Sequence, residues 1–474
     1  LRVRPARDRL SANPPRACNA VASSRASAVP PRMSRRGAPA SRLLSDAFMP
    51  GSETIVSTAS TAEPALVDGG RWLTLVGIGE DGLDGLSPAA RAAVEAASVV
   101  FGGARHLALA GAAVKGEARA WPSPFARGIA EVLALRGRKV CVLASGDPFL
   151  HGVGATLARQ VPADEMRAFP APSAFSLAGA RLGWPLAEVG CLTVHGRSLD
   201  LVRAHLHPGR RLLVLTSDGA GPGALARLLT ESGFGGSHLT VLEALGGPRE
   251  RVRRAPAEGF ALNDIDPLNL VAIEVAAGEG ARILARAPGL PDALFEHDGQ
   301  LTKREIRAVT LSALSPRRGE LLWDIGAGAG SIGIEWMLAD PSLTAIGIEE
   351  RPERAARARR NAAALGVPGL EIIEGRAPEA LAGLAAPDAI FVGGGAGEPG
   401  VLEAALAALK PGGRLVVNAV TLETEALLIA RHAALGGDLT RLSIARAVPV
   451  GGLTGWRPAM PVTQWSWTKP GGVS

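Results

Sequence analysis

Cysteine is scarce in this chain of 474 residues, and its three copies lie far apart. Cys18, Cys141 and Cys191 form no Cys-x-x-Cys pair, and the eight histidines do not fall at the spacing of metal ligands. A disulfide-rich scaffold is therefore excluded. The pattern predicts a reducing, cytoplasmic environment and no structural metal.

Long apolar runs are also missing. Although 47% of the residues are hydrophobic, none of the runs approaches the roughly 18 residues that a membrane-spanning helix needs. The chain is too long for one compact core, because domains usually hold about 100 to 200 residues. We therefore expect a globular protein with two domains and no membrane partner.

Acidic residues are almost absent from the beginning of the chain. Residues 1–50 hold ten arginines and two aspartates, a net charge of +8, whereas the whole chain carries +6. The remaining residues therefore sum to −2. With only 4% aromatic residues, this body lacks the basic face and the stacking platforms that nucleic acids need. We expect no nucleic-acid partner.

Residues 1–70 are rich in arginine, serine, alanine and proline and show no sustained period of 2 or 3.6. Such a composition cannot bury a core, so we expect disorder. The segment begins with leucine, and Met33 and Met49 follow, which favours an over-extended reading frame as a second interpretation. A transit peptide is the third, because the segment is rich in arginine and poor in acids.

From Trp72 onward, strand-like apolar runs alternate with helical stretches, a pattern typical of α/β domains. Ser87 and Pro88 mark the start of an early helix as its N-cap and first residue. We predict a first α/β domain over residues 71–278, a linker over 279–294 and a second α/β domain over 295–470. The predicted strands cover residues 73–79, 139–147, 191–196, 210–217, 238–247, 269–278, 320–326, 344–350, 370–375, 388–394, 413–420, 439–450 and 460–468.

The clearest motif is a glycine-rich loop in the second domain. It reads Asp324-Ile325-Gly326-Ala327-Gly328-Ala329-Gly330 and joins an apolar strand to a helix. Its glycines let the backbone turn tightly and approach a ligand closely. Glu349 ends the next predicted strand, where a carboxylate can accept hydrogen bonds from both ribose hydroxyls of a nucleoside cofactor.

Two classes of enzyme share such a loop. Gly328, Gly330 and Gly333 also fit the Gly-x-Gly-x-x-Gly fingerprint of dinucleotide-binding dehydrogenases. Two features favour S-adenosylmethionine as the cofactor: Asp324 stands two places before the first glycine, and antiparallel-looking strands follow residues 413–420. We therefore predict a Rossmann-like, doubly wound class I methyltransferase domain.

Several stretches of the second domain resemble the C-terminal, decarboxylating unit of the precorrin-6Y C5,15-methyltransferase family. They lie at residues 294–314, 323–336, 348–367, 374–381, 388–397 and 410–424. The resemblance implies contacts to S-adenosylmethionine from Thr302, Asp324, Gly326, Ala327, Gly328, Ala329, Gly330, Glu349 and Ala377. Thr302 is also a candidate N-cap, with Glu305 completing a capping box.

The first domain resembles the tetrapyrrole (corrin/porphyrin) methylase family. The matching stretches are VGIGEDG, FGGARHL, LASGDPFLHG, APSAFSLAGARLGW, HGR and EALGGPRERV. This family has two α/β lobes and binds its cofactor between them, which implies cofactor-site roles for Gly77, Gly79, Gly146, Asp147, Ser173 and Ala174. Many relatives read Gly-Val-Ser-Ser where this chain has residues 172–175. His195, Arg197, Glu243, Glu250 and Arg251 are candidates near the substrate, and surface ion pairing explains the last two equally well.

Together the two resemblances imply a bifunctional S-adenosylmethionine-dependent methyltransferase of cobalamin biosynthesis. Its expected reaction methylates carbons 5 and 15 of precorrin-6B and removes carbon dioxide from the ring C acetate, giving precorrin-8X. The carboxylates of such a tetrapyrrole need cationic partners. We expect substrate contacts from Lys303, Arg304, Arg307, Gly393 and Gly394, with Arg414 a further candidate; no catalytic side chain is identified.

A different function class stays open beside this one. The nucleoside-binding core is shared with methyltransferases that act on RNA or protein, and in that case the first domain is a non-catalytic binding module. The residues also leave open whether the tetrapyrrole carries cobalt. By resemblance, we expect a homo-oligomer.

Overall fold

The computed structural model describes residues 70–471. The expectations for the N-terminal tail therefore fall outside the described residues, apart from Gly70. Within the described part, no helix is long and apolar enough to cross a membrane.

The first sheet consists of five parallel strands in the order β3-β2-β4-β1-β5. Its strands are β1 (Leu73–Ile78), β2 (Val99–Gly102), β3 (Glu117–Ala120), β4 (Val140–Ser145) and β5 (Met166–Phe169). Successive side chains of β1 enter two different cores, because strand residues alternate between the faces of a sheet. Both faces are therefore covered, as parallel sheets require.

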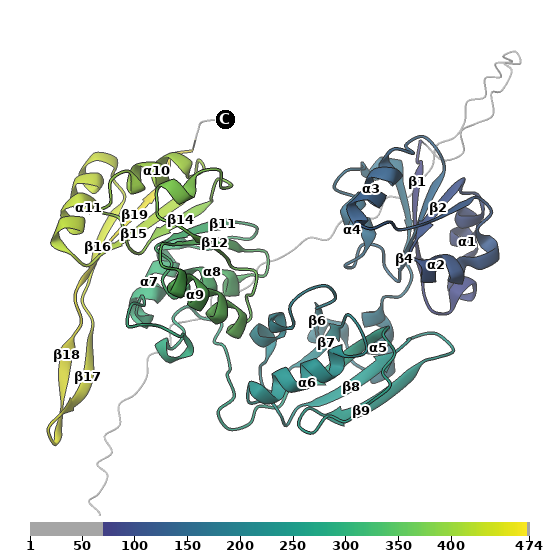
Figure 1. Ribbon diagram of the computed structural model, residues 1–474, viewed down its shortest axis with the longest axis horizontal. Helices are drawn as coiled ribbons and strands as arrows, with labels where there is room; N and C mark the ends of the chain where they lie inside the picture. The colour runs from purple at the N-terminus through teal and green to yellow at the C-terminus, as the bar shows by residue number, and fades with distance from the viewer. Residues whose placement is uncertain (1–69, 472–474) are drawn as a thin grey trace, which may run out of the picture. The chain divides into compact units, whose positions relative to one another are not determined.

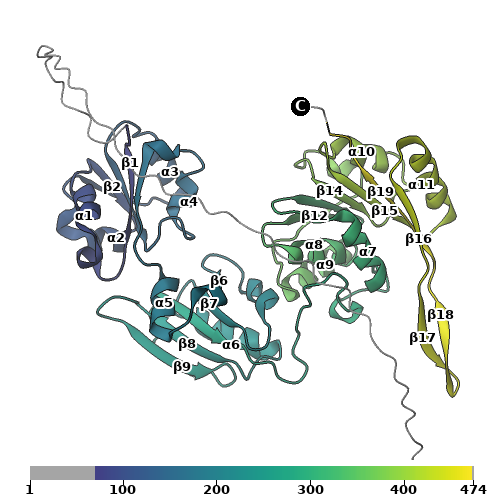
Figure 2. The same cartoon turned by 180° about the vertical axis from the view of Figure 1, so that it is seen from behind.

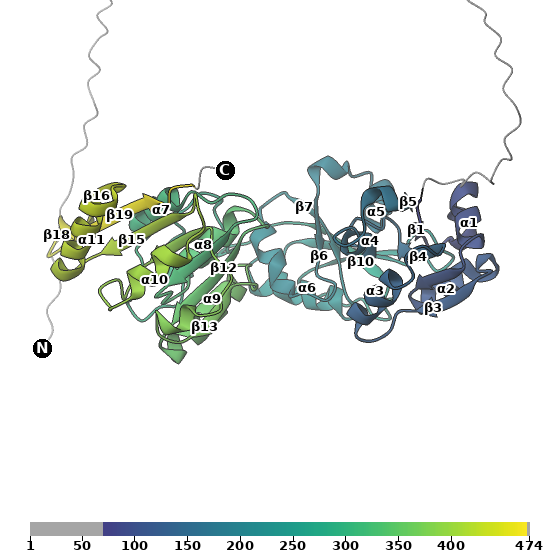
Figure 3. The ribbon, with the colours of Figure 1, turned by 90° about the horizontal axis from the view of Figure 1, so that it is seen from above.

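Four helices cover this sheet (Figure 3). α1 (Pro88–Glu95) and α2 (Ala104–Ala110) share one core, and α3 (Phe125–Leu133) and α4 (Val153–Leu157) share the other. The predicted start of α1 is confirmed: Ser87 Oγ accepts a hydrogen bond from Ala90 N at 3.2 Å, and Pro88 is the first helical residue.

The second sheet of the first domain is mixed and has the order β6-β7-β10-β8-β9. The strands are β6 (Gly190–Thr193), β7 (Arg211–Leu215), β8 (His238–Glu243), β9 (Arg251–Pro256) and β10 (Asn269–Glu274), and only β6 and β7 pair in parallel. α6 (Gly221–Glu231) packs on one face and α5 (Ala174–Leu182) on the other. The predicted two-lobed α/β organisation is confirmed.

The second domain contains a seven-stranded sheet with the order β13-β12-β11-β14-β15-β19-β16. Its strands are β11 (Leu321–Ile325), β12 (Thr344–Glu349), β13 (Glu371–Glu374), β14 (Ala389–Val392), β15 (Arg414–Ala419), β16 (Asp438–Leu442) and β19 (Val462–Thr468). The first five are parallel, and β19 is antiparallel to both of its neighbours. The predicted doubly wound sheet with antiparallel closing strands is confirmed.

Helices cover both faces of this sheet (Figures 1 and 2). α7 (Arg304–Leu314), α8 (Ser331–Ala339) and α9 (Pro352–Ala364) share one core, whereas α10 (Val401–Ala408) and α11 (Leu422–Leu435) pack into the other. Short 3-10 turns complete the two domains at Gly82–Gly85, Gly111–Ala113, Ala163–Glu165, Leu186–Glu188, Leu199–His205, Asp292–Leu294 and Glu379–Leu381.

A two-stranded hairpin projects from the second domain (Figure 1). It consists of β17 (Ala445–Val450) and β18 (Leu453–Pro458), which pair with each other outside the main sheet. The single strand predicted over residues 439–450 is therefore wrong, because β16 and β17 are separate strands in different sheets. β18 has no counterpart among the predicted strands.

Part of the predicted linker packs into the second domain. Leu284 and Leu290 are 4% and 1% exposed and belong to the core beneath α7 and α8. Backbone N–H groups of Gly289 and Leu290 donate to the Glu335 carboxylate at 2.6 and 2.9 Å. Leu284 is thus already part of the core of the second domain, although it lies inside the segment predicted as linker over 279–294.

Candidate functional sites

The second domain holds a cavity of about 640 Å³. Its lining includes residues that follow the carboxyl ends of β11, β14 and β15. The strand order reverses between β11 and β14, and open α/β sheets bind their ligands outside the strand ends at such a switch point. The switch point of the sheet and the cavity therefore coincide, and both mark the same candidate site.

The glycine loop forms one wall of this cavity. Gly326 and Gly328 have φ values of 75° and 57°, in the left-handed region that suits glycine. A Cβ atom on Gly326 would lie 3.1 Å from the backbone nitrogen of Gly394, so the loops after β11 and β14 meet closely. Side chains on this loop would close the space between them.

Two acidic side chains hold the loop and the first turn of helix α8, which follows it. Glu349 Oε2 accepts a hydrogen bond from Gly328 N at 2.8 Å, and its Oε1 accepts one from Arg351 N at 3.0 Å. Asp324 Oδ2 accepts a hydrogen bond from Gly333 N at 3.0 Å. Burial raises the pKa of Asp324 to about 7, and the nearby charge of Glu349 adds to the rise.

The structure brings most of the predicted residues to this cavity. The residues that line it are Thr302, Lys303, Asp324, Gly326, Ala327, Gly328, Ala329, Gly393 and Gly394. Gly330, Glu349, Ala377 and Arg304 are not part of the lining. Ala377 packs against the core that contains α10, and the ribose contact expected of Glu349 stays a prediction.

Two predicted substrate contacts need correction. Arg307 is fully buried, where it pairs with Glu335 and hydrogen-bonds the carbonyl oxygens of Thr302 and Leu290. Arg414 is also buried and donates to Glu320 and to the carbonyl oxygens of Leu314 and Ser315. These guanidinium groups satisfy protein acceptors, so both arginines have structural roles and neither lines the cavity.

The predicted N-cap of α7 is also wrong. The N-cap is Lys303, whose side chain makes no capping hydrogen bond, and α7 begins at Arg304. Thr302 lies one residue outside the cap and lines the cavity. Of its two predicted roles, only the one at the cavity is compatible with this geometry.

Sequence reasoning missed one end of this cavity. Ile444, Arg446, Val448, Arg457, Pro458, Ala459, Met460 and Val462 line it from the β17–β18 hairpin and its flanks, next to Asn418 and Val420. No motif marks these residues. The hairpin register would have been needed to find them.

The first domain has its own cavity of about 580 Å³. Residues after β1, β4 and β7, together with α5 and the start of β10, form its lining. Gly79, Gly146, Ser173, Ala174, His195 and Arg197 are predicted residues that lie in it. Gly77 and Asp147 do not, and the Asp147 carboxylate instead accepts a hydrogen bond from Phe149 N at 2.8 Å within the turn after β4.

Two glycines bring the ends of β1 and β4 together beside this cavity. A Cβ atom on Gly77 would lie 1.8 Å from the carbonyl oxygen of Gly146, so the strand ends of β1 and β4 are in direct backbone contact. Ser173 is the N-cap of α5, and its hydroxyl accepts a hydrogen bond from Ser176 N at 3.1 Å. The capping role of Ser173 and its place in the cavity coexist.

A polar cluster at α2 lines the same cavity. Arg105 donates to Ser145 Oγ at 2.6 Å, and the His106 Nε2 atom lies 2.8 Å from that oxygen. Burial, together with the charge of Arg105, lowers the pKa of His106 to about 4, so the imidazole is neutral at pH 7. Arg105 also pairs with Glu80. None of these residues was predicted to belong to the site.

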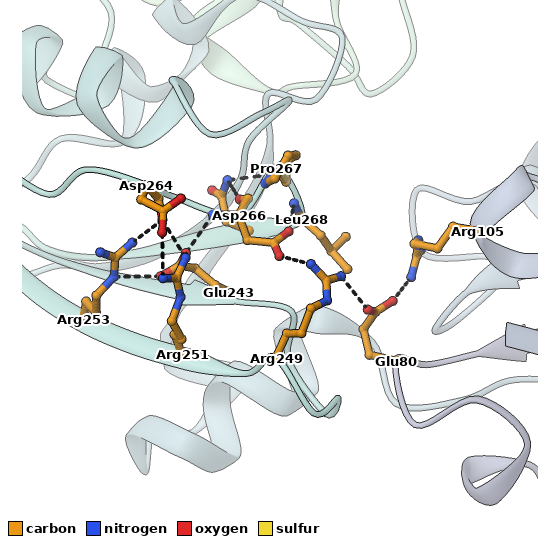
Figure 4. Close-up of polar contacts among 11 residues, drawn as sticks. Glu80, Arg105, Glu243, Arg249, Arg251, Arg253, Asp264, Asp266, Pro267 and Leu268 are labelled. Carbon is orange, nitrogen blue, oxygen red and sulfur yellow. Dashed lines mark hydrogen bonds and ion pairs between the residues drawn. The ribbon is translucent and has the colours of Figure 1, made fainter. Parts of the chain in front are cut away.

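Figure 4 shows how this cluster continues into the second lobe of the first domain. Arg249 lies 3.4 Å from Glu80 and also pairs with Asp266, which precedes the cavity residues at the start of β10. Beside it, the buried Glu243 carboxylate pairs with Arg251 at 2.7 Å and with Arg253 at 2.9 Å.

Three of the predicted substrate candidates are therefore engaged with protein partners. Glu243 and Arg251 pair with each other, and Glu250 pairs with Arg181 at 2.6 Å. None of the three lines the cavity. This result favours the ion-pairing interpretation of Glu250 and Arg251 and corrects the placement of Glu243.

The comparisons with known families agree with the division of the chain into two domains. Residues 72–261 match the family model of tetrapyrrole (corrin/porphyrin) methylases, and residues 293–469 match that of the precorrin methyltransferase domain. The protein is thus a methyltransferase with two methyltransferase domains.

Individual relatives narrow this class. The chain is 63% identical over 414 residues to a precorrin-6Y C(5,15)-methyltransferase [decarboxylating] from Sinorhizobium sp, covering 87% of this chain and all of that one. It is 43% identical over 404 residues to the protein of the same name from Mycobacterium tuberculosis, covering 84% of this chain and all of that one. A probable cobalt-precorrin-6B C(15)-methyltransferase (decarboxylating) from Pyrobaculum calidifontis is 36% identical over 182 residues, covering 37% and 93%. The chain belongs to the family of decarboxylating precorrin-6Y C(5,15)-methyltransferases, which confirms the resemblance seen in the sequence.

Both cavities fit S-adenosylmethionine, on which methyltransferases of this kind depend. Their volumes of about 580 and 640 Å³ lie within the roughly 300 to 1,000 Å³ of small-molecule sites. In each domain, glycines let neighbouring loops approach closely at the cavity: a Cβ on Gly146 would lie 2.9 Å from Pro172 O, and one on Gly326 would lie 3.1 Å from Gly394 N. Residues Gly326–Ala329 would hold the cofactor in the second domain, and Gly79, Gly146 and Ser173 in the first.

Proposed function

We propose that the first domain methylates carbon 5 of precorrin-6B, and that the second domain methylates carbon 15 and removes carbon dioxide from the ring C acetate, giving precorrin-8X. One observation carries this division of labour: each domain has a separate cavity lined by glycines at the ends of parallel strands. A relative named only for carbon 15 methylation and decarboxylation aligns with 182 residues of this chain, which is about the length of one domain.

Methyl transfer to carbon is an in-line displacement, so the protein must mainly orient the reactants and exclude water. S-adenosylmethionine supplies an electrophilic methyl group when bound. Glu349 accepts a hydrogen bond from the loop amide of Gly328, and Asp324 accepts one from Gly333 in helix α8, which follows the loop, so the loop is held on both sides. This rigidity pre-organises the second cavity for an attacking carbon of the substrate.

The substrate supplies the remaining chemistry. The bridging carbons of a reduced tetrapyrrole are electron-rich and serve as nucleophiles without a strong protein base. The conjugated imine of the macrocycle can accept the electrons that decarboxylation releases. In the first cavity, Arg197 and His195 can donate hydrogen bonds to its carboxylates, whereas Arg105 is already paired with Glu80.

The experiment is to incubate the full chain with precorrin-6B and methyl-labelled S-adenosylmethionine and to follow the mass and labelling of the product. The wild-type protein should add two methyl groups and release one carbon dioxide. Gly146→Val should lose only carbon 5 methylation, because a side chain there meets Pro172 O at 2.9 Å. Gly326→Val should lose only carbon 15 methylation and decarboxylation.

Two outcomes would contradict the proposal. If Gly326→Val lost both methylations and Gly146→Val lost neither, the first domain would be a binding module without catalytic activity. Label found in RNA or protein, with none in the tetrapyrrole, would favour the other function class. Parallel incubations with the cobalt-containing substrate decide which form the enzyme uses.

Assembly and location stay predictions. We expect a homo-oligomer in the cytoplasm. Light scattering on the purified chain tests the first expectation, and fractionation of the source cells tests the second.

A further inference from the structure

The β17–β18 hairpin places two arginines opposite each other. Arg446 on β17 pairs in register with Arg457 on β18. Residues in such a position extend from the same face of a hairpin with Cβ atoms about 4.5 to 5.5 Å apart. Both arginines line the cavity of the second domain.

Like charges directly across two strands are unfavourable unless a counter-charge is present. Arg446 has protein counter-charges, because it pairs with Glu305 and lies 3.6 Å from Asp292. Among residues 70–471, Arg457 has neither a hydrogen-bond partner nor an ion-pair partner. The hairpin therefore presents the cavity with a guanidinium group whose charge the described part of the protein does not balance.

The other side chains at this end of the cavity are mostly apolar, although Glu305, the partner of Arg446, and Asn418 also line it. Ile444, Val448, Met460 and Val462 line it beside the two arginines, and the glycine loop lines another part of the same cavity. A ligand for this end should combine an apolar body with acidic groups. A tetrapyrrole has this chemistry, since its ring system is apolar and its side chains end in carboxylates.

We propose that Arg446 and Arg457 form a carboxylate-binding subsite for the acid side chains of the tetrapyrrole in the second domain. A planar guanidinium group binds a carboxylate through two parallel hydrogen bonds, which also fixes its orientation. Arg446, held by Glu305, anchors the hairpin to α7, and Arg457 supplies the free charge. This inference rests on the proposed function of the second domain and names the residues that recognise its substrate.

The first test is Arg457→Gln in the full chain. The Michaelis constant for precorrin-6B in carbon 15 methylation should rise roughly tenfold or more, as expected for loss of a hydrogen bond to a charged group. The constant for S-adenosylmethionine and the rate of carbon 5 methylation should stay at their wild-type values. Arg441→Gln is the matched control, because Arg441 is exposed, pairs with Glu425 and lies outside the cavity.

Conservative variants separate charge from geometry. Arg457→Lys keeps the charge but loses the two-pronged contact, so its Michaelis constant should fall between those of wild type and Arg457→Gln. An unchanged constant for precorrin-6B in Arg457→Gln would overturn the proposal. An equal rise in the Arg441→Gln control would overturn it too, as would a change confined to S-adenosylmethionine.

A binding measurement separates this proposal from the proposed function. Uroporphyrin, a stable tetrapyrrole polycarboxylate, serves as a fluorescent probe of the wild-type chain and the variants. If the wild type fails to methylate precorrin-6B, the proposed function fails, while weaker binding of uroporphyrin to Arg457→Gln than to wild type would still support the subsite. If methylation proceeds and neither measurement distinguishes Arg457→Gln from wild type, the subsite alone fails.

Discussion

Gly77 and Gly146 are in backbone contact beside the first cavity: a Cβ atom on Gly77 would lie 1.8 Å from the Gly146 carbonyl oxygen. No side-chain motion can relieve that overlap, so Gly77→Ala must push the ends of β1 and β4 apart. We expect it to abolish carbon 5 methylation, to leave carbon 15 methylation intact and to destabilise the first domain by about 1 to 3 kcal/mol or more. Product mass and calorimetry measure these effects.

The control for this prediction is Gly223→Ala, in α6 of the same domain. A Cβ atom at Gly223 would meet nothing nearer than 4.0 Å, and alanine favours a helix more than glycine does. We expect Gly223→Ala to keep the activity and the stability of the wild type. Carbon 5 methylation at the wild-type rate in Gly77→Ala would show that the two strand ends can separate freely.

Arg307→Met should destabilise the second domain by about 3 to 5 kcal/mol, because it leaves the buried Glu335 carboxylate without its cation. Urea denaturation of the variant measures the loss. Arg360→Met is the control, since Arg360 forms an exposed pair with Glu296 and such pairs contribute about 1 kcal/mol or less. A higher Michaelis constant for the tetrapyrrole with unchanged stability would instead restore the predicted substrate role of Arg307.

Glu349→Ala should weaken S-adenosylmethionine binding in the second domain by roughly ten- to a hundredfold. It removes a carboxylate that accepts a hydrogen bond from Gly328 N at 2.8 Å and so shapes the glycine loop. Calorimetric titration of the full chain should then show one site with wild-type affinity and one weakened site. Two unchanged sites would mean that the loop holds its shape without Glu349.

The sequence alone predicted most strands with a strong apolar pattern, although the buried strand β2 was missed. The apolar runs of β1, β4, β8 and β11 are buried on both faces, and they were identified. β3 and β9 were missed because they are edge strands with exposed residues, such as Glu117 and Arg251. Exposed edge strands of this kind lack an apolar pattern, whereas the edge strands β6 and β13, which contain apolar residues such as Leu192 and Ile372, were identified.

The site followed the same division. The glycine loop was identifiable because tight turns and close backbone approach demand glycine at particular positions. No sequence motif distinguishes Arg307 from Arg457. In the structure, Arg307 is buried beside Glu335, whereas Arg457 lines the cavity. Burial and cross-strand register determine whether an arginine is structural or lines the cavity. Both arise from tertiary packing, which no local pattern encodes.

The stability of the second domain should depend on pH through Asp324. Its pKa in the folded protein is raised to about 7 from an ordinary value of 3.8, mainly by burial. The folded state therefore favours the protonated carboxyl, and its stability should fall as the pH rises from about 4 to about 7. Asp324→Asn stays neutral throughout and should not share this loss. Its free energy of unfolding relative to wild type should accordingly increase over this range, by about 4 kcal/mol at most, since one pKa unit corresponds to about 1.4 kcal/mol. Denaturation of both proteins at pH 5 and pH 8 measures the change, and an equal difference at the two pH values would contradict the raised pKa.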